Sequence, residues 1–452
     1  MDAHGGAAGP IERLERMLRS PLVRLLAIGG LALVLQVPVL FIGDLVRERR
    51  STRDAAVEEM GSTWGGVQRL AGPFLVVPYR VPSADADSVP AEAVATFLAA
   101  ELSVAADLSA ERLRRGLFEA PVYRAAIVLS GTFEPPDFAQ WAVPSGEVLW
   151  ERAELAFDVS GVRSIRTGAR LRWGETDLEF EPGTGLRAGG TGIHARVGGP
   201  WRSRDGLTFQ ATLDLAGSAS LRVAPTGQAT AVEVTGDWPH PSFRGAWLPA
   251  ERELRDDGFS AEWHISHLGR GFPQSWRGTT YGKEIETASV GVDLLTPVDP
   301  YRQSERSLKY SLLFLALTFG VAWLFEVLGG ARLHLAHYTL IGAAMCLFYL
   351  LELALSEHIG FPAAYALAAA LVVVTNGAYA RSLLAPRRAA LLAGVLCVLY
   401  AGIYVLLQLD DHALLAGAGA LFLILAAIMY ATRAVDWHAA GSKPERAGGG
   451  TR

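Results

Sequence analysis

The side chains that could do chemistry in this chain are a few polar groups inside or beside long apolar segments. The candidates are Glu305, Arg306, Glu326, Glu352, Ser356, Glu357 and His358. Glu352 and Ser356 are four residues apart and would share one face of a helix. An ionisable group at membrane depth costs at least about 2.5 kcal/mol on insertion scales, so each is a functional candidate by default. The alternative is that these groups pair with Ser, His or Tyr and only hold helices together.

Familiar catalytic signatures are absent from the sequence. It contains no Gly-x-x-x-x-Gly-Lys-Ser/Thr phosphate loop and no His-Glu-x-x-His zinc helix. It also contains no Ser-x-x-Lys or Gly-x-Ser-x-Gly nucleophile, and its carboxylates show no spacing that singles out an acid and base pair. We therefore expect no catalytic residue, no cofactor-binding residue and no enzymatic activity.

Metal and disulfide chemistry are not expected in the middle of the chain. Both cysteines, Cys346 and Cys397, lie in apolar runs of the last third, which leaves no thiolate between residues 44 and 307. His264 and His267 are three residues apart, so in a strand they would point to opposite faces and would not share a metal. The sequence therefore predicts no metal ligand.

The apolar residues are concentrated in six long runs. Of 452 residues, 50% are hydrophobic and only 19% are charged, less than the roughly 25% of soluble domains. A run of about 18 or more apolar residues can cross the ~30 Å hydrocarbon core as a helix. The predicted spans are 25–43, 308–328, 338–355, 361–380, 389–408 and 413–431. The net charge of −5 is mild and gives no indication of a nucleic-acid partner.

The charges of the short loops predict the orientation in the membrane. Two short loops are basic: one contains Arg332, and the other contains Arg381, Arg387 and Arg388. They alternate along the chain with the loops 356–360 and 409–412, which contain no Lys or Arg. Cytoplasmic loops are enriched in Lys and Arg, so both termini are predicted to be cytoplasmic. The first run carries polar residues and lacks an Ala-x-Ala-like site after it, so we expect an uncleaved signal anchor.

These observations predict the domain organisation. We expect a membrane protein with an α-helical bundle of six transmembrane helices, one plus five, and a large β-rich (α+β) periplasmic domain. The predicted parts are a cytoplasmic segment 1–24, an anchor 25–43, a periplasmic domain 44–307, a five-helix bundle 308–431 and a cytoplasmic tail 432–452. The lipid bilayer is the first predicted partner.

Within the exported domain, an initial helix is expected to give way to strands. Residues 47–69 place apolar side chains at helical spacing, and Pro73 is expected to end this helix. Runs at 171–174, 177–181, 207–215 and 219–223 alternate at period two between Gly or Pro turns. Such strands are typical of sandwiches or open barrels around one or two cores.

A weak internal repeat suggests two similar β units. Residues 126–138 match 231–243 at an offset of 105, and residues 157–160 match 263–266 at an offset of 106. Two collinear matches predict units of about 96–200 and 201–290. The alternative is a chance similarity between strands and turns of the same kind.

Several stretches resemble a known family. They are Trp64-Gly-Gly-Val-Gln68, Gly72-Pro73-Phe74-Leu75, Pro121-Val-Tyr123, the Glu181-Pro-Gly-Thr-Gly-Leu run, Trp238-Pro-His-Pro-Ser-Phe, Asp299-Pro-Tyr-Arg302 and the Ser356-Glu-His-Ile-Gly-Phe run. On these motifs the chain resembles the CreD-like inner-membrane proteins, which are described as cell-envelope integrity proteins of Gram-negative bacteria. The resemblance covers nearly the whole chain. It implies a role in envelope integrity and in the response to envelope stress or β-lactams, and it implies no enzymatic activity or cofactor.

The function expected from these observations is non-catalytic. The periplasmic domain would bind an envelope protein, peptidoglycan or lipid, and residues 299–310, with Glu305 and Arg306, would couple this domain to the bundle. The alternative for residues 299–310 is a purely structural role, as an interfacial anchor that contacts lipid phosphates. The sequence leaves the partner and the oligomeric state open.

Two other functions are weighed against this expectation. One is a lipid or small-solute transporter that uses Glu326, Glu352, Glu357 and His358 in a polar path. The other is a membrane-anchored envelope hydrolase, which would require two carboxylates about 5–9 Å apart in a cleft.

Overall fold

The computed structural model describes most of the chain. The described residues are 21–81, 91–166, 168–187, 190–198, 207–278, 280–296, 299–329, 333–409 and 413–433. Most of the predicted cytoplasmic segment 1–24 and tail 432–452 lies outside them, as does Arg332. The chain divides into two compact units, one of Met1–Thr52 with Val298–Arg452 and one of Arg53–Pro297. Each unit is described below by itself.

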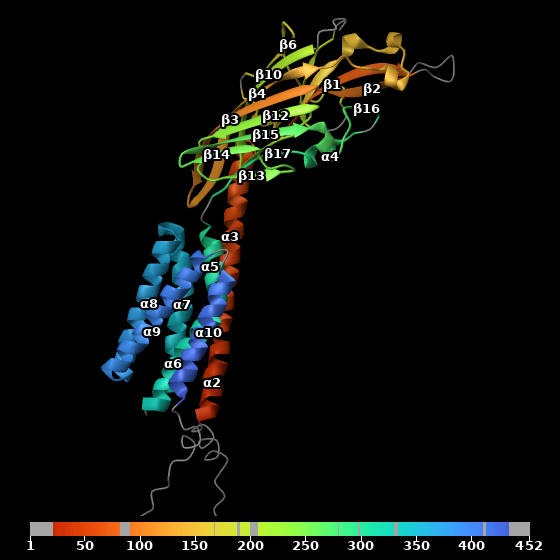
Figure 1. Ribbon diagram of the computed structural model, residues 1–452. Coiled ribbons are helices and arrows are strands. Elements are labelled where there is room, and N and C mark those ends of the chain that lie inside the picture. Colours follow the sequence, from red (N-terminus) through yellow and green to blue (C-terminus); the bar gives the residue numbers. More distant parts are fainter. Residues whose placement is uncertain are drawn as a thin grey trace, which may run out of the picture. The chain divides into compact units, whose positions relative to one another are not determined.

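The first unit is built from helices (Figure 1). They are α2 (Pro21–Val34), the first part of α3 (Gln36–Trp64), α5 (Pro300–Lys309), α6 (Ser311–Gly329), α7 (Leu335–Ile359), α8 (Phe361–Leu383), α9 (Pro386–Gln408) and α10 (Ala413–Thr432). Among the described residues, four helices are long and apolar enough to cross a membrane: Val23–Trp64, α7, α8 and α9. The pair formed by α5 and α6 bends by 45° and would be a fifth. The apolar N-terminal helix is confirmed, and the count of six spans stays a prediction.

Local sequence explains the short helix α5. Asp299 caps its start, where the carboxylate accepts hydrogen bonds from the N–H groups of Tyr301 at 3.0 Å and Arg302 at 3.4 Å. Pro300 occupies the first turn, where a missing N–H costs nothing. The helix then breaks at Tyr310 before α6 begins. The result is a separate amphipathic helix in front of an apolar one.

Aromatic rings form the centre of the helical unit. Phe348 on α7 is fully buried, and its ring centroid lies 4.7 Å from that of Tyr400 on α9 and 5.2 Å from that of Tyr365 on α8. Phe314 on α6 lies 4.8 Å from Tyr400. Rings at these separations pack favourably beyond their area alone, so three of the C-terminal helices and α6 meet at one aromatic cluster.

The second unit contains two β-sheets (Figure 1). The nine-stranded sheet has β1 (Gln68–Val81), β2 (Ala91–Leu98), β5 (Glu154–Val159), β8 (Glu181–Pro182), β9 (Gly192–Arg196), β11 (Ser220–Val223), β13 (Pro241–Gly245), β16 (Ser275–Arg277) and β17 (Val290–Leu294). The eight-stranded sheet has β3 (Glu101–Arg115), β4 (Phe118–Phe133), β6 (Arg170–Trp173), β7 (Thr176–Leu178), β10 (Leu207–Ser218), β12 (Ala229–Gly236), β14 (Glu251–Arg255) and β15 (Gly258–Ser266).

The two sheets share one main hydrophobic core. Alternate residues of β3 are buried, as period-two patterning requires, and they join buried side chains of β1 and β5 from the other sheet. Trp263 of β15 and Tyr123 of β4 are among its largest members. A smaller cluster on the opposite face of the nine-stranded sheet includes Phe74 and Ile285 of helix α4 (Gly282–Thr287). Of the expected alternatives, a sandwich or an open barrel around one or two cores, the structure shows two sheets around one main core.

The helix that precedes the sheets ends earlier than expected. The spacing predicts a helix over residues 47–69 that Pro73 ends, but α3 ends at Trp64 because Gly65 and Gly66 follow with φ of +154° and +73°. A side chain at Gly65 would also place its Cβ 2.4 Å from the Ala216 carbonyl oxygen. Pro73 instead lies inside β1, at a shift in the register with β5.

The two predicted repeat units do not form separate bodies. Their strands pair with one another in both sheets, since β12 lies parallel to β3 and β16 lies antiparallel to the end of β2. The second matched block also lies in different sheets, on β5 in one copy and on β15 in the other. The duplication itself stays a prediction.

Candidate functional site

Glu352 is the most deeply buried carboxyl group among the predicted residues. It lies on α7 with no solvent exposure, and its Oε2 accepts a hydrogen bond of 2.9 Å from Ser307 of α5. Ser304, also on α5, lies against the same carboxyl group. Its other oxygen, Oε1, has no hydrogen-bond partner among the described residues. Ser356 is buried on the same helix, but its hydroxyl donates to the Leu353 carbonyl of its own helix at 2.8 Å.

The other predicted carboxylates of the helical unit have different partners. Glu326 on α6 pairs with Arg24 of α2 and accepts a hydrogen bond of 3.2 Å from the Tyr338 hydroxyl. Glu357 accepts from the Tyr301 hydroxyl at 3.0 Å. His358 is exposed, and its Nδ1 lies 3.1 Å from the carbonyl oxygen of Ala354 in the preceding turn. The four residues of the predicted polar path are these three and Glu352. The structure places them in separate contacts and not in one shared polar network.

Glu305 and Arg306 tie α5 to neighbouring helices. Glu305 lies 3.4 Å from the Arg50 guanidinium on α3. Arg306 donates hydrogen bonds to the carbonyl oxygens of Leu406 and Leu409, at 3.5 and 3.2 Å, at the end of α9. A guanidinium at a helix C-terminus satisfies carbonyls that have no partner within the helix. Both side chains thus fix α5 within the helical unit, and their predicted role in coupling stays a prediction.

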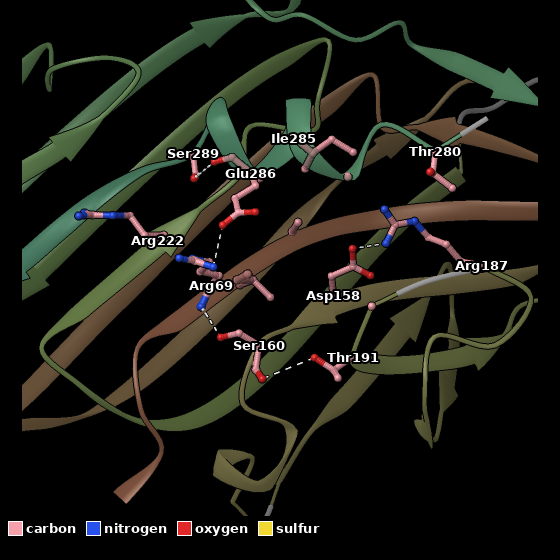
Figure 2. A pocket seen from close by; sticks show the side chains of 15 residues that line it. Arg69, Asp158, Ser160, Arg187, Thr191, Arg222, Thr280, Ile285, Glu286 and Ser289 are labelled. Carbon is pink, nitrogen blue, oxygen red and sulfur yellow. Dashed lines mark hydrogen bonds and ion pairs between the residues drawn. The ribbon is translucent and has the colours of Figure 1, made fainter. Parts of the chain in front are cut away.

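A cleft in the β-rich unit was not predicted. It has a volume of about 410 Å³ and lies on the outer face of the nine-stranded sheet, beside α4 (Figure 2). Its polar lining residues are Arg69, Asp158, Ser160, Arg187, Thr191, Arg222, Thr280, Glu286 and Ser289. Ala71 and Ile285 are among the apolar residues that line it. Volumes of 300–1,000 Å³ are typical of small-molecule sites.

Strand register brings the charged residues of the cleft together. Arg69 of β1 is directly opposite Arg222 of the parallel neighbour β11. Two residues further along β1, Ala71 is opposite Asp158 of the antiparallel neighbour β5. Side chains two residues apart on a strand share a face, so all four positions face the same side of the sheet. The intervening Leu70 points into the core, where it is 1% exposed.

Each of the two neighbouring arginines is paired with an acid. Arg69 lies 2.7 Å from Glu286 of α4, with more than half of each side chain exposed. Arg222 lies 2.5 Å from Asp293 of β17 and is largely buried. Like charges directly opposite one another in a sheet repel, so these carboxylates stabilise the arginine pair. The lining carries three arginines and two carboxylates, and Asp293, which lies beside the cleft, balances the third arginine.

Asp158 and Arg187 form a second, more buried ion pair in the cleft (Figure 2). The Arg187 guanidinium also lies 3.7 Å from the centre of the Phe74 ring, a cation–π contact that fixes its position. Burial raises the pKa of Asp158, and this effect exceeds the opposing attraction of Arg187. The Oδ1 atom of Asp158 is buried and has no hydrogen-bond partner among the described residues.

The hydroxyl groups of the cleft have structural partners. Ser160 accepts a hydrogen bond from the Arg69 backbone N–H at 2.9 Å and donates to the Val67 carbonyl at 2.9 Å. Thr191 donates to the Val159 carbonyl at 2.9 Å. These hydroxyl protons are committed to backbone carbonyls, so neither group is placed as an activated nucleophile. In the described part of the chain, no group of three or more His, Cys, Asp or Glu could hold a metal ion. The arrangement is suited to binding by charge and hydrogen bonding.

Sequence reasoning missed every charged residue of this cleft. The alternation of Arg69, Leu70 and Ala71 could have indicated an outward-facing arginine. No local signal indicates that Arg222 and Asp158 lie on the neighbouring strands. The predicted candidates were chosen for their position in or beside apolar runs, and that criterion cannot find a site on a sheet.

Comparison with known proteins gives two matches along nearly the whole chain. The family described as "Inner membrane protein CreD" matches residues 20–438. The Inner membrane protein CreD of Escherichia coli (strain K12) is 33% identical over 435 residues, which cover 94% of this chain and 95% of that protein.

Proposed function

The chain belongs to the CreD family of inner membrane proteins, and we propose that it supports cell-envelope integrity and the response to envelope or β-lactam stress by binding an envelope component. The observation that carries this proposal is the cleft of about 410 Å³ on the outer face of the nine-stranded sheet. Its charged lining and its unpartnered Asp158 oxygen are features of a binding site. The binding unit would face the periplasm.

The distribution of basic residues supports this orientation. Arg381 lies in the last turn of α8, and Arg387 and Arg388 lie in the first turn of α9, so the short connection between these helices is basic. The connection between α7 and α8 instead carries Glu357 and no Lys or Arg. By the positive-inside rule, the first connection is cytoplasmic and the second is periplasmic. The β-rich unit precedes α5 in the chain. Two spans, α7 and the pair α5 and α6, separate it from the second connection, so both lie on the same side of the membrane. This supports a periplasmic location for the β-rich unit.

The absence of catalysis is part of the proposal. Asp158 and Glu286 are the two carboxylates that line the cleft, and each is paired with an arginine of the same cleft. The hydroxyls of Ser160 and Thr191 donate to backbone carbonyls. This pairing supports binding over an envelope hydrolase, which needs one free carboxylic acid and one activated water or nucleophile.

Transport through the helical unit is a second candidate, because one observation favours it. Glu352 is fully buried beside the bent pair α5 and α6, and its Oε1 has no partner among the described residues. Broken membrane helices beside buried carboxyl groups occur in transporters. If transport is the function, Glu352→Gln will abolish complementation of a deletion strain while Arg69→Gln has no effect. The opposite pattern supports the binding function.

In-cell photocrosslinking tests the binding function directly. The residue p-benzoylphenylalanine is placed at Thr280, an exposed lining residue of the cleft, in the full-length protein. The matched control is the same residue at Thr176, which is exposed on the other sheet. We expect a crosslinked envelope component from Thr280 that is absent from Thr176 and is lost when Arg69→Gln is added. Equal crosslinking from both positions, or none from Thr280, would contradict the proposal.

The orientation has its own test. Alkaline phosphatase, which is active only after export, is fused within the β-rich unit and, separately, at the C-terminus. We expect activity from the first fusion and not from the second. The reverse pattern would place the β-rich unit in the cytoplasm and would remove the envelope-binding function.

A further inference from the structure

We propose that the cleft binds the free end groups of a short peptide, a carboxylate at Arg69 and an amino group at Asp158. This inference rests on the proposed binding function and assigns its ligand class. The ligand is of dipeptide size and carries both charged groups.

Arg69 provides the carboxylate site. It lines the cleft from β1, whereas the side chain of its cross-strand neighbour Arg222 is paired with Asp293 and points away from Arg69 (Figure 2). The partner of Arg69, Glu286, is an exposed side chain of α4, and exposed ion pairs contribute little to stability. A ligand carboxylate can therefore replace Glu286 at the Arg69 guanidinium at small cost. Guanidinium groups bind carboxylates through two parallel hydrogen bonds, which gives this end of the site its preference.

Asp158 provides the amino-group site. One of its oxygens, Oδ2, is paired with Arg187, which is itself held against the Phe74 ring. Its other oxygen, Oδ1, is buried and without a partner among the described residues, although the residue lines the cleft. A buried acceptor without a donor is destabilising, and an ammonium group is the donor that compensates a carboxylate best. The geometry thus favours a cationic donor at this end.

The separation of the two ends sets the ligand length. Asp158 is opposite Ala71, which lies two residues from Arg69 on β1. Two residues of a strand span about 6.6–6.8 Å and neighbouring strands lie about 4.8 Å apart, so the two backbone positions are roughly 8 Å apart. An extended dipeptide spans at most about 7 Å. Hydrogen bonds of about 2.9 Å at each end extend its reach. A dipeptide therefore bridges the two charged side chains, and the cleft volume of about 410 Å³ accommodates it.

Binding of blocked and unblocked dipeptides tests this assignment. Full-length protein in lipid nanodiscs is titrated by calorimetry with alanyl-alanine, its N-acetyl form, its C-terminal amide and inorganic phosphate. We expect the unblocked dipeptide to bind at least tenfold more tightly than either blocked form and than phosphate. Arg69→Gln should weaken dipeptide binding at least tenfold, and Asp158→Asn should remove the preference over the N-acetyl form.

The control is Arg172→Gln, which removes an exposed arginine of the other sheet that pairs with Asp177 at 3.0 Å. It should leave dipeptide binding unchanged, and thermal unfolding curves should show that each variant is folded. Equal binding of blocked and unblocked forms, full competition by phosphate, or no binding of any form would overturn the ligand class. If crosslinking from Thr280 persists in those cases, the binding function stands and only the ligand class is wrong.

Discussion

Removing one buried hydroxyl group should loosen the connection between the two sheets. Tyr123 of β4 has no solvent exposure, and its hydroxyl donates a hydrogen bond of 2.8 Å to the Ser220 carbonyl of β11. This bond joins the eight-stranded sheet to the strand that carries Arg222. Burial raises the pKa of Tyr123, so the hydroxyl remains a donor across the usual range of assay pH. Tyr123→Phe deletes the bond and keeps the ring.

The expected loss of stability follows from the burial of both partners. A neutral hydrogen bond contributes about 0.5–1.5 kcal/mol, and a buried carbonyl left without a donor costs about 1–3 kcal/mol. The phenyl ring fills nearly the same space, so the cavity contribution is small. We expect a loss of about 1–2 kcal/mol in the free energy of unfolding, within these ranges. For a unit of this size, that loss lowers Tm by about 2–8 °C.

The assay is thermal unfolding of the full-length protein in detergent, followed by near-UV circular dichroism. The matched control is Tyr79→Phe. The Tyr79 ring is 4% exposed and lies 5.8 Å from Phe138, but its hydroxyl has no hydrogen-bond partner within the described residues. We expect Tyr79→Phe to leave Tm nearly unchanged. An equal loss of Tm in the two variants would contradict this prediction, because the loss would then come from the surroundings of the ring and not from the bond to Ser220.

Three further predictions concern pH, packing and the helical unit. The raised pKa of Asp158 means that the folded state holds more protons than the unfolded chain between pH 3.8 and the folded pKa, so its contribution to stability falls as pH rises through that window. Asp158→Asn should remove this slope from plots of Tm against pH. Gly217→Ala should destabilise by about 1–3 kcal/mol in urea titrations, since its Cβ would lie 2.3 Å from the Tyr123 ring, and an unchanged midpoint would contradict this. Arg24→Gln should lower Tm in detergent by leaving Glu326 unpaired, whereas adding Glu326→Gln should restore most of the loss.

The helices were largely predictable because their signals are local. An apolar run long enough to span a bilayer is a property of one continuous segment, and the N-terminal helix and helices α7, α8 and α9 follow the predicted runs. Strand β10 likewise follows the alternation at 207–215. The end of α3 was missed because Gly65 and Gly66 stop the helix before the proline that was expected to stop it.

The functional residues were less predictable, because their surroundings are not local. Glu352 was singled out as a carboxylate in an apolar run, and only the structure shows that its partner is Ser307 on another helix. The same is true of Glu326, which pairs with Arg24 near the start of the chain. An ionisable residue at membrane depth can be found in the sequence, but the partner that compensates it cannot.

The sequence by itself determined the membrane character, the β-rich nature of the long segment between the first and second apolar runs, and the family. Apolar length, period-two alternation and collinear motifs all depend only on the order of residues along the chain. Only the tertiary structure decided which side chains meet in the cleft. Arg69, Asp158 and Arg222 belong to three strands that are far apart in the sequence, and the hydrogen-bond register of β1 with β5 and β11 makes them neighbours. A one-residue change in that register would turn such side chains to the opposite face, so the site depends on pairings that no local pattern specifies.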